Sequence, residues 1–486
     1  MKKPGTILIF LSLATGCTVG PNYKRPTVDV PAVYRGAAPS TDASQSAGPV
    51  SEDKKASPQT KPQNAQPAAS SIGDEKWWDV FQDKQLQDLI RTALQNNYDV
   101  NIAAARILKA QAQLGITRAD QLPTLNAGAQ ALNWQLPRNR ELPATDSSYS
   151  ALGAGFNWQL DFWGKYRRAT EAARANLFAA RWAREYVIST LVSDVAASYF
   201  QLRAYDLQLE IARRTLASRQ QSLQLTKTLA DGGAATNLDV RQAEQLVAKA
   251  AETIPDLERS IEEQENYIST LLGKNPGPIA RGLPLTEQPH PPDVPAGLPS
   301  SLLERRPDIR EAEAQLMAAN ARIGVAKAAY YPDISLTATA GYASSALTSL
   351  FTGPAGFWAF GGTLTQPIFA GGRIKSGVRY SEAEQQEMLL VYKQTIQQAF
   401  RGVSDSLVAY QKDREYRQHQ EELVAAAKDS AQLSQDRYRG GATNYLEVLT
   451  NETNAFDAEL GLAQAQANEL LTLVEIYRNL GGGWEG

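Results

Sequence analysis

The apolar residues of this chain follow two periods that alternate along the sequence. From position 188 onward an apolar residue recurs at every seventh position, and no proline interrupts the stretch 164–253. A sustained heptad stripe is typical of a helix that packs along other helices in a coiled coil. A helix over about 165–229 would be ~100 Å long at ~1.5 Å per residue. The stripe consists of Ile188, Val195, Leu202, Leu209, Leu216 and Leu223.

The second period is two, and it marks short segments that precede the long helices. In "YSALGAGFNWQLDFWG" apolar residues alternate with glycine and polar residues, and three other segments alternate in the same way. Each has about the ten residues that a tilted membrane-spanning strand needs. The alternative is a soluble β-hairpin with one buried face. Aromatic residues gather near the strand ends, as in the interfacial girdles of membrane barrels: Trp134, Trp158, Phe162, Trp163, Phe357 and Trp358.

Most of the chain is an internal duplication. Asp99 matches Asp308 at a separation of 209 residues, and Gly232 matches Gly440 at a separation of 208. A nearly constant offset over such a length indicates duplication rather than chance similarity. In each repeat we expect a medium helix, two strands, a very long helix, a tight turn and a second long helix. The predicted fold class is α+β, with two tandem repeats that each combine a long coiled-coil helical hairpin with a two-stranded β-hairpin.

The duplication sets the expected domain boundaries. The first repeat covers 75–275, the second covers 300–483, and a proline-rich connector at 276–299 joins them. The expected strands and helical hairpins are about 124–135 and 149–162 with a hairpin at 165–271, and about 333–344 and 357–369 with a hairpin at 373–478.

Both helical hairpins are expected to reverse at one motif, which reads "DGGAATNLDV" in the first repeat and "RGGATNYLEV" in the second. Its glycines can adopt the left-handed conformation that ends a helix. Thr236 or Asn237 can cap the next helix in the first repeat, and Thr443 or Asn444 in the second. An ordinary interhelical turn explains these residues fully, but it leaves the length of the helices unexplained.

Four strands are too few to stand alone in a membrane. Unpaired backbone groups at a sheet edge cost several kcal/mol each in lipid, and known barrels begin at about eight strands. The chain is therefore expected to pool its strands with copies of itself. Two copies give eight strands and three give twelve, and a pore with a polar lining favours the larger number.

Composition narrows the chemistry. The formal net charge of −3 gives no strong field for nucleic acid. The chain has two histidines, His290 and His419, and one cysteine, Cys17, so neither a disulfide framework nor a Cys/His metal site is expected. Nothing in the sequence resembles a phosphate-binding loop. We therefore expect no catalytic residues, no metal, no cofactor, and a protein that is not an enzyme.

The N-terminus has the features of an export signal. In "MKKPGTILIFLSLATGC" two lysines precede a short apolar run, and small residues precede Cys17. The pattern predicts a lipoprotein signal peptide at 1–16 and a mature chain that begins at an acylated Cys17. The alternative is an ordinary secretory signal with an incidental cysteine. Residues 17–72 are expected to form the acylated N-terminus and a Pro/Ser/Gln-rich tether, and no later segment predicts a membrane helix.

Several longer motifs resemble one known family. The stretches "LLERRPDIREAEAQLMAANARIGVAKAAYYPDISL" and "LTQPIFAGGRIKSG", with "CTVGPNYKRP", "NWQLDFWGK" and "TNLDVRQAE", are similar to the TolC-type outer-membrane factors, in particular the lipoprotein (NodT-like) subgroup of multidrug efflux systems. The resemblance implies a homotrimer with a twelve-strand β-barrel in outer-membrane lipid, continued by a periplasmic α-helical barrel. It also implies two partners, a periplasmic adaptor (membrane-fusion) protein and an inner-membrane RND-type transporter.

The resemblance further implies that the hairpin tips form a closed periplasmic entrance. A relative's pattern there is leucine, aspartate four residues on, and arginine three further, and the matching positions here are Leu446, Thr450 and Thr453. Leu446 fits a hydrophobic constriction. Thr450 carries no charge, so the usual acidic ring is not at this position, and Glu447 and Glu452 are nearby candidates for negative charge. An ionic and a hydrophobic resting gate both remain as alternatives.

The repeat offset adds gate candidates from the first hairpin. Leu238 is the companion of Leu446, and Asp239 and Arg241 are candidates for interhelical pairing. Each candidate also has a simpler interpretation. The leucines could pack within their hairpins, Asp239 and Glu447 could cap their helices, and Arg241 could be a solvated or ion-paired helix residue.

Together these features favour an exit duct. We expect an outer-membrane channel of a tripartite efflux pump, which passively exports drugs or small amphiphilic compounds from the periplasm to the exterior and is gated by the hairpin tips. One alternative is the outer-membrane duct of an ABC-driven type I protein secretion system. Another is a coiled-coil lipoprotein spacer that never crosses the membrane.

Overall fold

The structure is a computed structural model, and it describes residues 18–31, 33–36, 71–136, 145–289, 294, 297 and 299–484. The predicted signal peptide at 1–16, the predicted acylation of Cys17 and positions 37–70 of the predicted tether lie outside the described residues, as does His290. No helix within the described residues has the length and the apolar character needed to cross a lipid bilayer.

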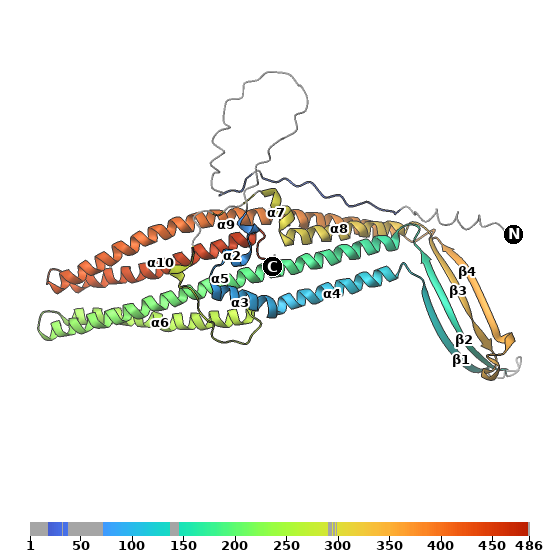
Figure 1. The fold of residues 1–486 in the computed structure, drawn as a ribbon, viewed down its shortest axis with the longest axis horizontal. Helices are drawn as coiled ribbons and strands as arrows, with labels where there is room; N and C mark the ends of the chain where they lie inside the picture. The colour runs from blue at the N-terminus through green and yellow to red at the C-terminus, as the bar shows by residue number, and fades with distance from the viewer. Residues whose placement is uncertain are drawn as a thin grey trace, which may run out of the picture. The chain divides into compact units, whose positions relative to one another are not determined.

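The elements follow one order twice along the chain (Figure 1). This confirms the predicted α+β fold with two tandem repeats. The first repeat contains α2 (Trp77–Val80), α3 (Lys84–Asn96), α4 (Tyr98–Ala119), β1 (Thr124–Leu136), β2 (Thr145–Leu160), α5 (Lys165–Asp231) and α6 (Asn237–Leu271). The second contains α7 (Pro299–Arg305), α8 (Pro307–Ala328), β3 (Asp333–Ser344), β4 (Gly356–Thr365), α9 (Arg373–Arg439) and α10 (Tyr445–Asn479).

The chain divides into two compact units that both draw on the two repeats. Among the described residues, the strand unit comprises those from 18 to Thr27, Ala105–Arg181 and Glu311–Gln394. The hairpin unit comprises Val28–Ala104, Trp182–Arg310 and the residues from Thr395 onward. The sheet belongs to the strand unit, and both helical turns belong to the hairpin unit.

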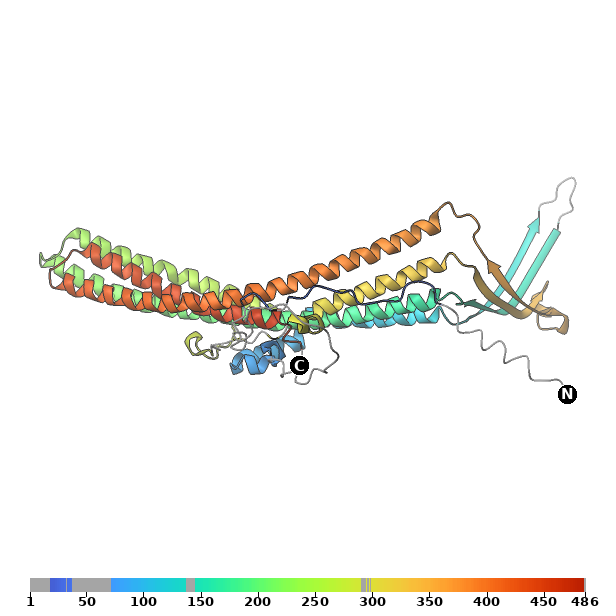
Figure 2. The same ribbon diagram turned by 90° about the horizontal axis from the view of Figure 1, so that it is seen from above.

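The strand unit is built on one antiparallel sheet with the strand order β1-β2-β3-β4, which Figure 2 shows from a second side. Strand β2 pairs with β3, so the strands of the two repeats join at the centre of the sheet. Gly153 lies opposite Gly341 in this pair. A Cβ on Gly341 would come within 2.3 Å of the Leu152 carbonyl oxygen, so glycine is what allows the two strands to approach closely here.

The two faces of the sheet differ, as the alternating pattern predicts. Most large apolar side chains share one face, and glycine and polar residues predominate on the other. Near one end of the sheet the second face also carries Leu132, Trp134, Tyr149 and Phe357. Leu125 on β1 and Trp358 and Phe360 on β4 are largely exposed, and β4 is exposed along its whole length. Within the described residues, the outer strands of the sheet therefore carry an uncovered apolar face and two unpaired edges.

Two strands end earlier than expected. Strand β4 ends at Thr365 rather than at 369, because Pro367 has no N–H group to donate to the ladder. Strand β2 begins at Thr145 rather than at 149 and ends at Leu160 rather than at 162. After Leu160 the carboxylate of Asp161 accepts hydrogen bonds from the first turn of α5, from the N–H groups of Tyr166 at 3.2 Å and Arg167 at 2.9 Å.

The first described residues form a strap, residues 18–25, which docks within the strand unit. The Val19 N–H group donates to the Trp163 carbonyl oxygen at 3.0 Å. The buried guanidinium of Arg168 on α5 donates to the Val19 carbonyl oxygen at 3.2 Å and to Oδ1 of Asn22 at 2.8 Å. These contacts hold the start of the described chain beside the junction between β2 and α5.

The hairpin unit contains the heptad seam of α5. Its positions become less buried toward the helical turn, from Ile188, Val195 and Leu202, which are buried, to Leu209, Leu216 and Leu223, which are partly buried. The buried positions pack in one core with residues of α3, α6 and α10. The seam predicted from the sequence is therefore a packing surface, as a heptad stripe requires.

In the second repeat the equivalent stripe on α9 is interrupted by Arg417. The guanidinium of Arg417 forms ion pairs with Glu469 of α10 and with Glu421 of its own helix. The Glu469 side chain is almost fully buried, so a charged pair replaces an apolar contact at this position. Four of the other stripe positions are buried and apolar or aromatic, and the fifth, Ala431, is partly buried: Ile396, Val403, Tyr410 and Val424.

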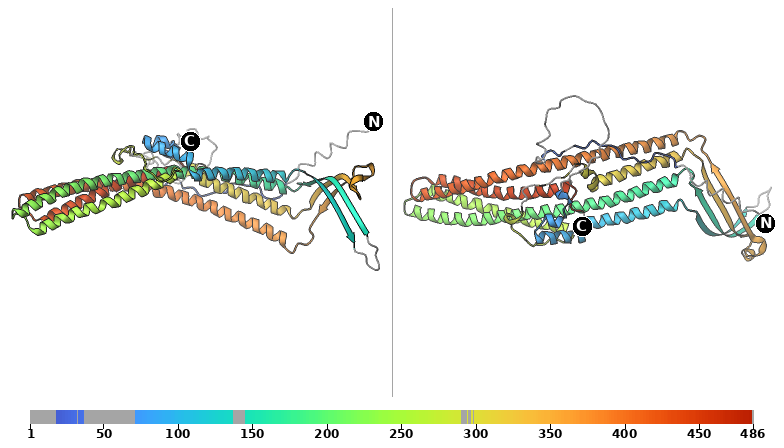
Figure 3. Two further views of the ribbon diagram at one scale, coloured as in Figure 1. Left: turned by 90° about the horizontal axis from the view of Figure 1, so that it is seen from below. Right: turned by 45° about the horizontal axis from the view of Figure 1, so that its top comes forward.

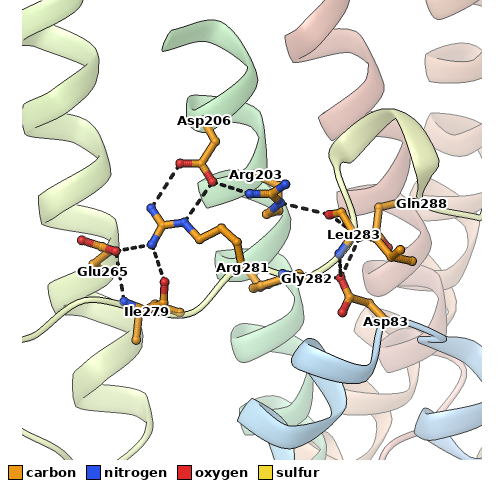
Figure 4. A network of polar contacts seen from close by, with 10 residues as sticks. Asp83, Arg203, Asp206, Glu265, Ile279, Arg281, Gly282, Leu283 and Gln288 are labelled. Carbon is orange, nitrogen blue, oxygen red and sulfur yellow. Dashed lines mark hydrogen bonds and ion pairs between the residues drawn. The ribbon is translucent and has the colours of Figure 1, made fainter. Parts of the chain in front are cut away.

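A polar network fixes the connector between the repeats to the hairpin unit (Figure 4). The guanidinium of Arg281 pairs with the carboxylate of Asp206 on α5 at 3.0 Å and with that of Glu265 on α6. Two residues further on, the Leu283 N–H group donates to Oδ2 of Asp83 at 2.9 Å. The connector is therefore held by charged side chains from α5 and α6 and by the residue that precedes α3.

Asp83 concentrates several of these hydrogen bonds in one buried carboxylate. It accepts from the Tyr199 hydroxyl at 2.9 Å, from Nε2 of Gln288 at 3.0 Å and, as the N-cap of α3, from the Gln85 N–H group at 2.8 Å. Burial alone would raise the pKa of Asp83, but these hydrogen bonds outweigh it and lower the pKa. The stabilisation is therefore present above the pKa of the unfolded chain and is lost as the pH falls through the folded-state pKa.

We expect Asp83→Ala to lower the free energy of unfolding by about 3 kcal/mol, because several buried donors lose their acceptor at once. Asp88→Ala is the matched control, since Asp88 is half exposed and pairs only along its own helix with Arg91 at 2.6 Å. Urea unfolding of the two variants measures the difference. Equal losses of unfolding free energy in both variants would show that the buried hydrogen bonds of Asp83 stabilise the protein no more than the exposed Asp88 ion pair does.

Candidate functional site at the hairpin tips

The first tip, where α5 reverses into α6, is closed by a glycine turn and a capping box. Gly233 has φ +75°, and the Ala234 N–H group donates to the Leu229 carbonyl oxygen at 2.8 Å. Thr236 is the N-cap of α6, and its hydroxyl accepts from the Asp239 N–H group at 3.2 Å. The Asp239 carboxylate accepts in return from the Thr236 N–H group at 2.8 Å, so Thr236 rather than Asn237 caps this helix.

The second tip, where α9 reverses into α10, has the same geometry with different partners. Gly441 has φ +71°, and Asn444 caps α10 by accepting from the Glu447 N–H group at 3.3 Å. The Glu447 carboxylate accepts from the Thr443 hydroxyl and pairs with Arg437 of α9 at 3.3 Å. Glu447 thus links the two helices of its own hairpin across the turn.

In each glycine pair only the second residue has a positive φ and therefore needs to be glycine. We expect Gly441→Ala to lower the stability of the purified protein by about 1 kcal/mol, because alanine is strained at positive φ. Gly440 continues the helix by donating from its N–H group to the Asp436 carbonyl oxygen at 3.0 Å, so Gly440→Ala should be neutral or slightly stabilising. Thermal unfolding compares the pair, and a larger loss for Gly440→Ala would contradict this assignment.

The two leucines predicted at the gate point away from the packed interior of the tips. Leu238 is 65% exposed and Leu446 is 52% exposed. The interior is formed instead by a cluster of α6 and α10 residues, which includes Leu246, Tyr445 and Val448. The two hairpins therefore pack on each other through this cluster, and Figure 3 shows them side by side. Within one chain, neither leucine is part of this cluster.

The residues at the usual latch positions form local hydrogen bonds. The Thr450 hydroxyl donates to the Leu446 carbonyl oxygen at 2.9 Å, and the Thr453 hydroxyl donates to the Leu449 carbonyl oxygen at 2.7 Å. Both bonds run back along α10 by four residues and bring no charge to the tip.

The predicted interhelical pairing of Asp239 and Arg241 is replaced by another pair. Asp239 is held in the capping box, and Arg241 pairs with Glu244 one turn further along α6 at 2.6 Å. Glu244 in turn pairs with Lys227 of α5 at 3.5 Å, so Lys227 and Glu244 carry the interhelical contact. Glu244 lies three residues after Arg241 on the same helix, a spacing at which opposite charges commonly pair.

Sequence reasoning missed one buried cation near the tip. Arg219 on α5 is 2% exposed. Its Nε lies 3.9 Å from the carboxylate of Glu452, a residue that the sequence suggested only as a source of negative charge near the tip. Arg219 stands three residues after Leu216 of the heptad stripe, which was a signal that its side chain would face the core. In the described part of the chain, no group of three or more His, Cys, Asp or Glu residues is placed to hold a metal ion.

The chain combines two helical hairpins that pack together at their tips with a sheet that has an uncovered apolar face. This combination is typical of the class of outer-membrane channels. The chain belongs to the outer membrane efflux protein family, whose sequence model matches residues 89–274 and 298–482. It is therefore a protein of the outer membrane that extends into the periplasm, with a channel rather than an enzyme as its family type.

Individual relatives cover nearly the whole chain. The probable efflux pump outer membrane protein TtgC of Pseudomonas putida is 35% identical over 473 residues, which cover 96% of this chain and 93% of TtgC. The cation efflux system protein CusC of Escherichia coli is 34% identical over 472 residues, which cover 97% of this chain and 96% of CusC. Among solved structures, the outer-membrane channel OprN matches with a TM-score of 0.84 and 29% identity, covering 97% of this chain and all of OprN.

Proposed function

We propose that this protein is the exit duct of a tripartite efflux pump, formed by three copies that pool their strands into a twelve-strand barrel. The observation that carries the proposal is the four-stranded sheet with two unpaired edges and an uncovered apolar face. The helical hairpins of the three copies would continue the barrel into the periplasm. Drugs or small amphiphilic compounds would leave through this tube by passive diffusion.

The sheet argues for a shared barrel on energetic grounds. In lipid, each unpaired backbone group on β1 or β4 would cost several kcal/mol, so both edges must find partners. The face that carries Leu125, Trp358 and Phe360 suits contact with lipid, while the opposite face of glycine and polar residues suits a water-filled lumen. Three copies of a four-stranded sheet supply twelve strands, which is enough to enclose a polar pore.

The junction between helices and strands supports a membrane boundary at the base of the sheet. Trp163 stacks on Tyr331 with ring centroids 4.7 Å apart, and the Trp163 indole N–H donates to the Pro332 carbonyl oxygen at 2.9 Å. Aromatic side chains of this kind favour the level of the lipid headgroups. The strap places Val19 beside Trp163 at this same junction.

The proposed gate is the ring of hairpin tips. Leu238 and Leu446 are exposed on one chain, and in a closed ring of three chains they would narrow the entrance with apolar side chains. Thr450 and Thr453 form local hydrogen bonds, which favours a hydrophobic constriction over an ionic ring at this level. Contact with a periplasmic adaptor would separate the tips, and an inner-membrane RND-type transporter would supply the energy. The duct itself would need no cofactor and carry out no catalysis.

A deletion strain tests the proposed function. Loss of the gene should restore sensitivity to detergents and dyes, and a plasmid copy should reverse the effect. Unchanged tolerance together with loss of a secreted protein would favour the duct of an ABC-driven type I secretion system. Unchanged tolerance and unchanged secretion would contradict both ducts and would leave the non-channel spacer.

A further inference from the structure

Four large apolar side chains interrupt the polar face of the sheet near the strand ends that are farthest along the chain from the helices. Leu132 and Trp134 on β1 are both 47% exposed. Tyr149 on β2 is 39% exposed, and Phe357 on β4 is 40% exposed. Among the described residues that share this part of the face, none is charged. This end of the sheet therefore presents uncovered rings on the face that the proposed barrel turns toward its lumen.

Three of these side chains come together on the β1–β2 hairpin. Leu132 lies directly opposite Tyr149, and Trp134 lies opposite Ser147 on the same face. Tyr149 is therefore a diagonal neighbour of Trp134 at ~7–8 Å, a separation that aromatic side chains span. Strand β1 is an edge of the sheet, so the other side of Trp134 is open within one chain.

The internal duplication indicates how a second copy would pair with this edge. Thr124 of β1 pairs with Asn157 of β2. The equivalent pair in the second repeat is Asp333 of β3 with Thr365 of β4. Equivalent positions in the two repeats are thus 209 residues apart on β1 and β3, and 208 residues apart on β2 and β4. If β4 pairs with β1 of the next copy as β2 pairs with β3, these offsets fix the register.

The offsets convert the central β2–β3 pairing into a predicted pairing between copies. Ala151 of β2 pairs with Ala343 of β3. The equivalent residues are Ala359 of β4 and Trp134 of β1, so Ala359 of one copy would lie opposite Trp134 of the next. Both residues belong to the same face of the sheet. The predicted register therefore continues this face across the boundary between copies.

The side chains that the second copy brings opposite β1 are too small to cover the rings. Ala359 ends in a methyl group, and the next residue of β4 on this face toward the helices is Gly361. Phe357, two residues before Ala359 on the same face, becomes a second diagonal neighbour of Trp134. Trp134 thus lies between Tyr149 of its own chain and Phe357 of the next copy.

We propose that each boundary between copies forms a binding site for aromatic compounds on the lumen face of the barrel. The site consists of Trp134 and Tyr149 of one copy and Phe357 of the next, and it is complete only in the assembled protein. Three such sites form a collar through which exported compounds pass. This inference rests on the proposed function, because it names a chemical class that the duct carries.

The chemistry of the site selects flat aromatic compounds. Aromatic rings attract one another in stacked or edge-to-face arrangements with centroids ~4.5–7 Å apart. An aromatic cation gains a further attraction to the negative ring faces. Contacts of this kind are individually weak, so a bound compound can leave again, as passage through a pore requires. The collar offers the apolar surface of such a compound a partner at the end of an otherwise polar lumen.

Single-channel recording of the purified full-length protein in planar lipid bilayers tests the site, with ethidium, a flat aromatic cation, as the probe. Ethidium should briefly interrupt the current through wild-type channels. Trp134→Leu removes a ring but keeps an apolar side chain, and it should shorten the interruptions about fivefold, which corresponds to ~1 kcal/mol. Trp358→Leu is the matched control, because Trp358 is 74% exposed on the opposite face of the same sheet. The control should leave the interruptions unchanged.

The outcomes of this experiment separate the site from the duct. Wild-type channels that conduct without interruption, or equal interruptions in the wild-type protein and Trp134→Leu, would overturn the site. Equal shortening by Trp134→Leu and Trp358→Leu would overturn it as well. Phe357→Leu gives a second measurement if Trp134→Leu fails to assemble, and unchanged interruptions in that variant would count against the site. Wild-type protein that forms no channels would contradict the proposed function instead.

Disulfide cross-linking tests whether two copies share the site. The predicted register places Gly361 opposite Leu132 of the next copy, and a Cβ added to Gly361 would meet nothing within 4 Å in the single chain. Gly361→Cys with Leu132→Cys should link neighbouring copies, since directly opposite residues lie ~4.5–5.5 Å apart, within reach of a disulfide. Gly361→Cys with Gln130→Cys is the control, shifted by two residues on the same face. Electrophoresis without reductant measures both pairs, and equal or stronger linking of the control pair would overturn the shared site.

Discussion

Phe360→Arg is expected to abolish assembly of the protein in the outer membrane. Phe360 is 78% exposed on the edge strand β4, and the proposed barrel turns it toward lipid. An arginine near the middle of the lipid face costs about 2–4 kcal/mol, and a trimer carries the substitution three times. Membrane fractionation followed by unheated gel electrophoresis should show loss of the trimer and of membrane-bound protein.

The neighbouring residue provides the control for this experiment. Ala359 lies on the same strand, and its side chain belongs to the opposite, small-residue face of the sheet. In the proposed barrel this face lines the water-filled lumen, so Ala359→Arg should still assemble. Equal assembly of both variants would show that the apolar face does not contact lipid. Loss of both would show that the strand tolerates no large residue on either face.

Leu446→Ala is expected to increase the single-channel conductance severalfold without loss of stability. Leu446 is half exposed in the single chain, so its truncation removes little packing within the subunit. If it narrows the closed entrance, the smaller side chain widens the constriction and weakens its exclusion of water. Planar bilayer recordings of the wild-type and variant proteins measure the effect.

Val448→Ala is the matched control at the same tip. Val448 is 1% exposed in the tip cluster, so its truncation should lower stability by about 1–3 kcal/mol. Because the side chain is buried within the subunit, the conductance should stay near that of the wild-type protein. A rise in conductance for Val448→Ala alone would indicate that loosening of the hairpin, and not the width at Leu446, sets the closed state.

Much of the fold could be predicted because its patterns are local and occur twice. The heptad stripe from Ile188 marked the buried seam of α5, and alternation marked the four strands. The predicted end of β4 at 369 is too late: the alternating apolar positions extend to Ile368, but Pro367 has no N–H group to donate to the sheet.

The tip chemistry was less predictable, because several residues there could fill the same role. Thr236 and Asn237 are both good caps, and only the backbone geometry selects Thr236. Arg241 had possible partners on its own helix and on the neighbouring one, and the local partner Glu244 was formed. Neither choice can be made from spacing alone.

Long-range charged contacts were beyond sequence reasoning. Arg219 and Glu452 are 233 residues apart, and Arg417 and Glu469 are 52 apart. The heptad register indicates that Arg417 and Arg219 face inward, but not which carboxylate on another helix meets them. These partners follow from how the hairpins pack, which the sequence of one helix does not contain.

The central claim is that identical copies of this chain complete a shared barrel, and the mass of the purified particle tests it most directly. The full-length protein should be extracted in mild detergent, and its mass measured by native mass spectrometry after the detergent is removed. The account predicts a particle of three chains that forms channels in lipid bilayers. A particle of one chain that remains in solution without detergent would contradict it.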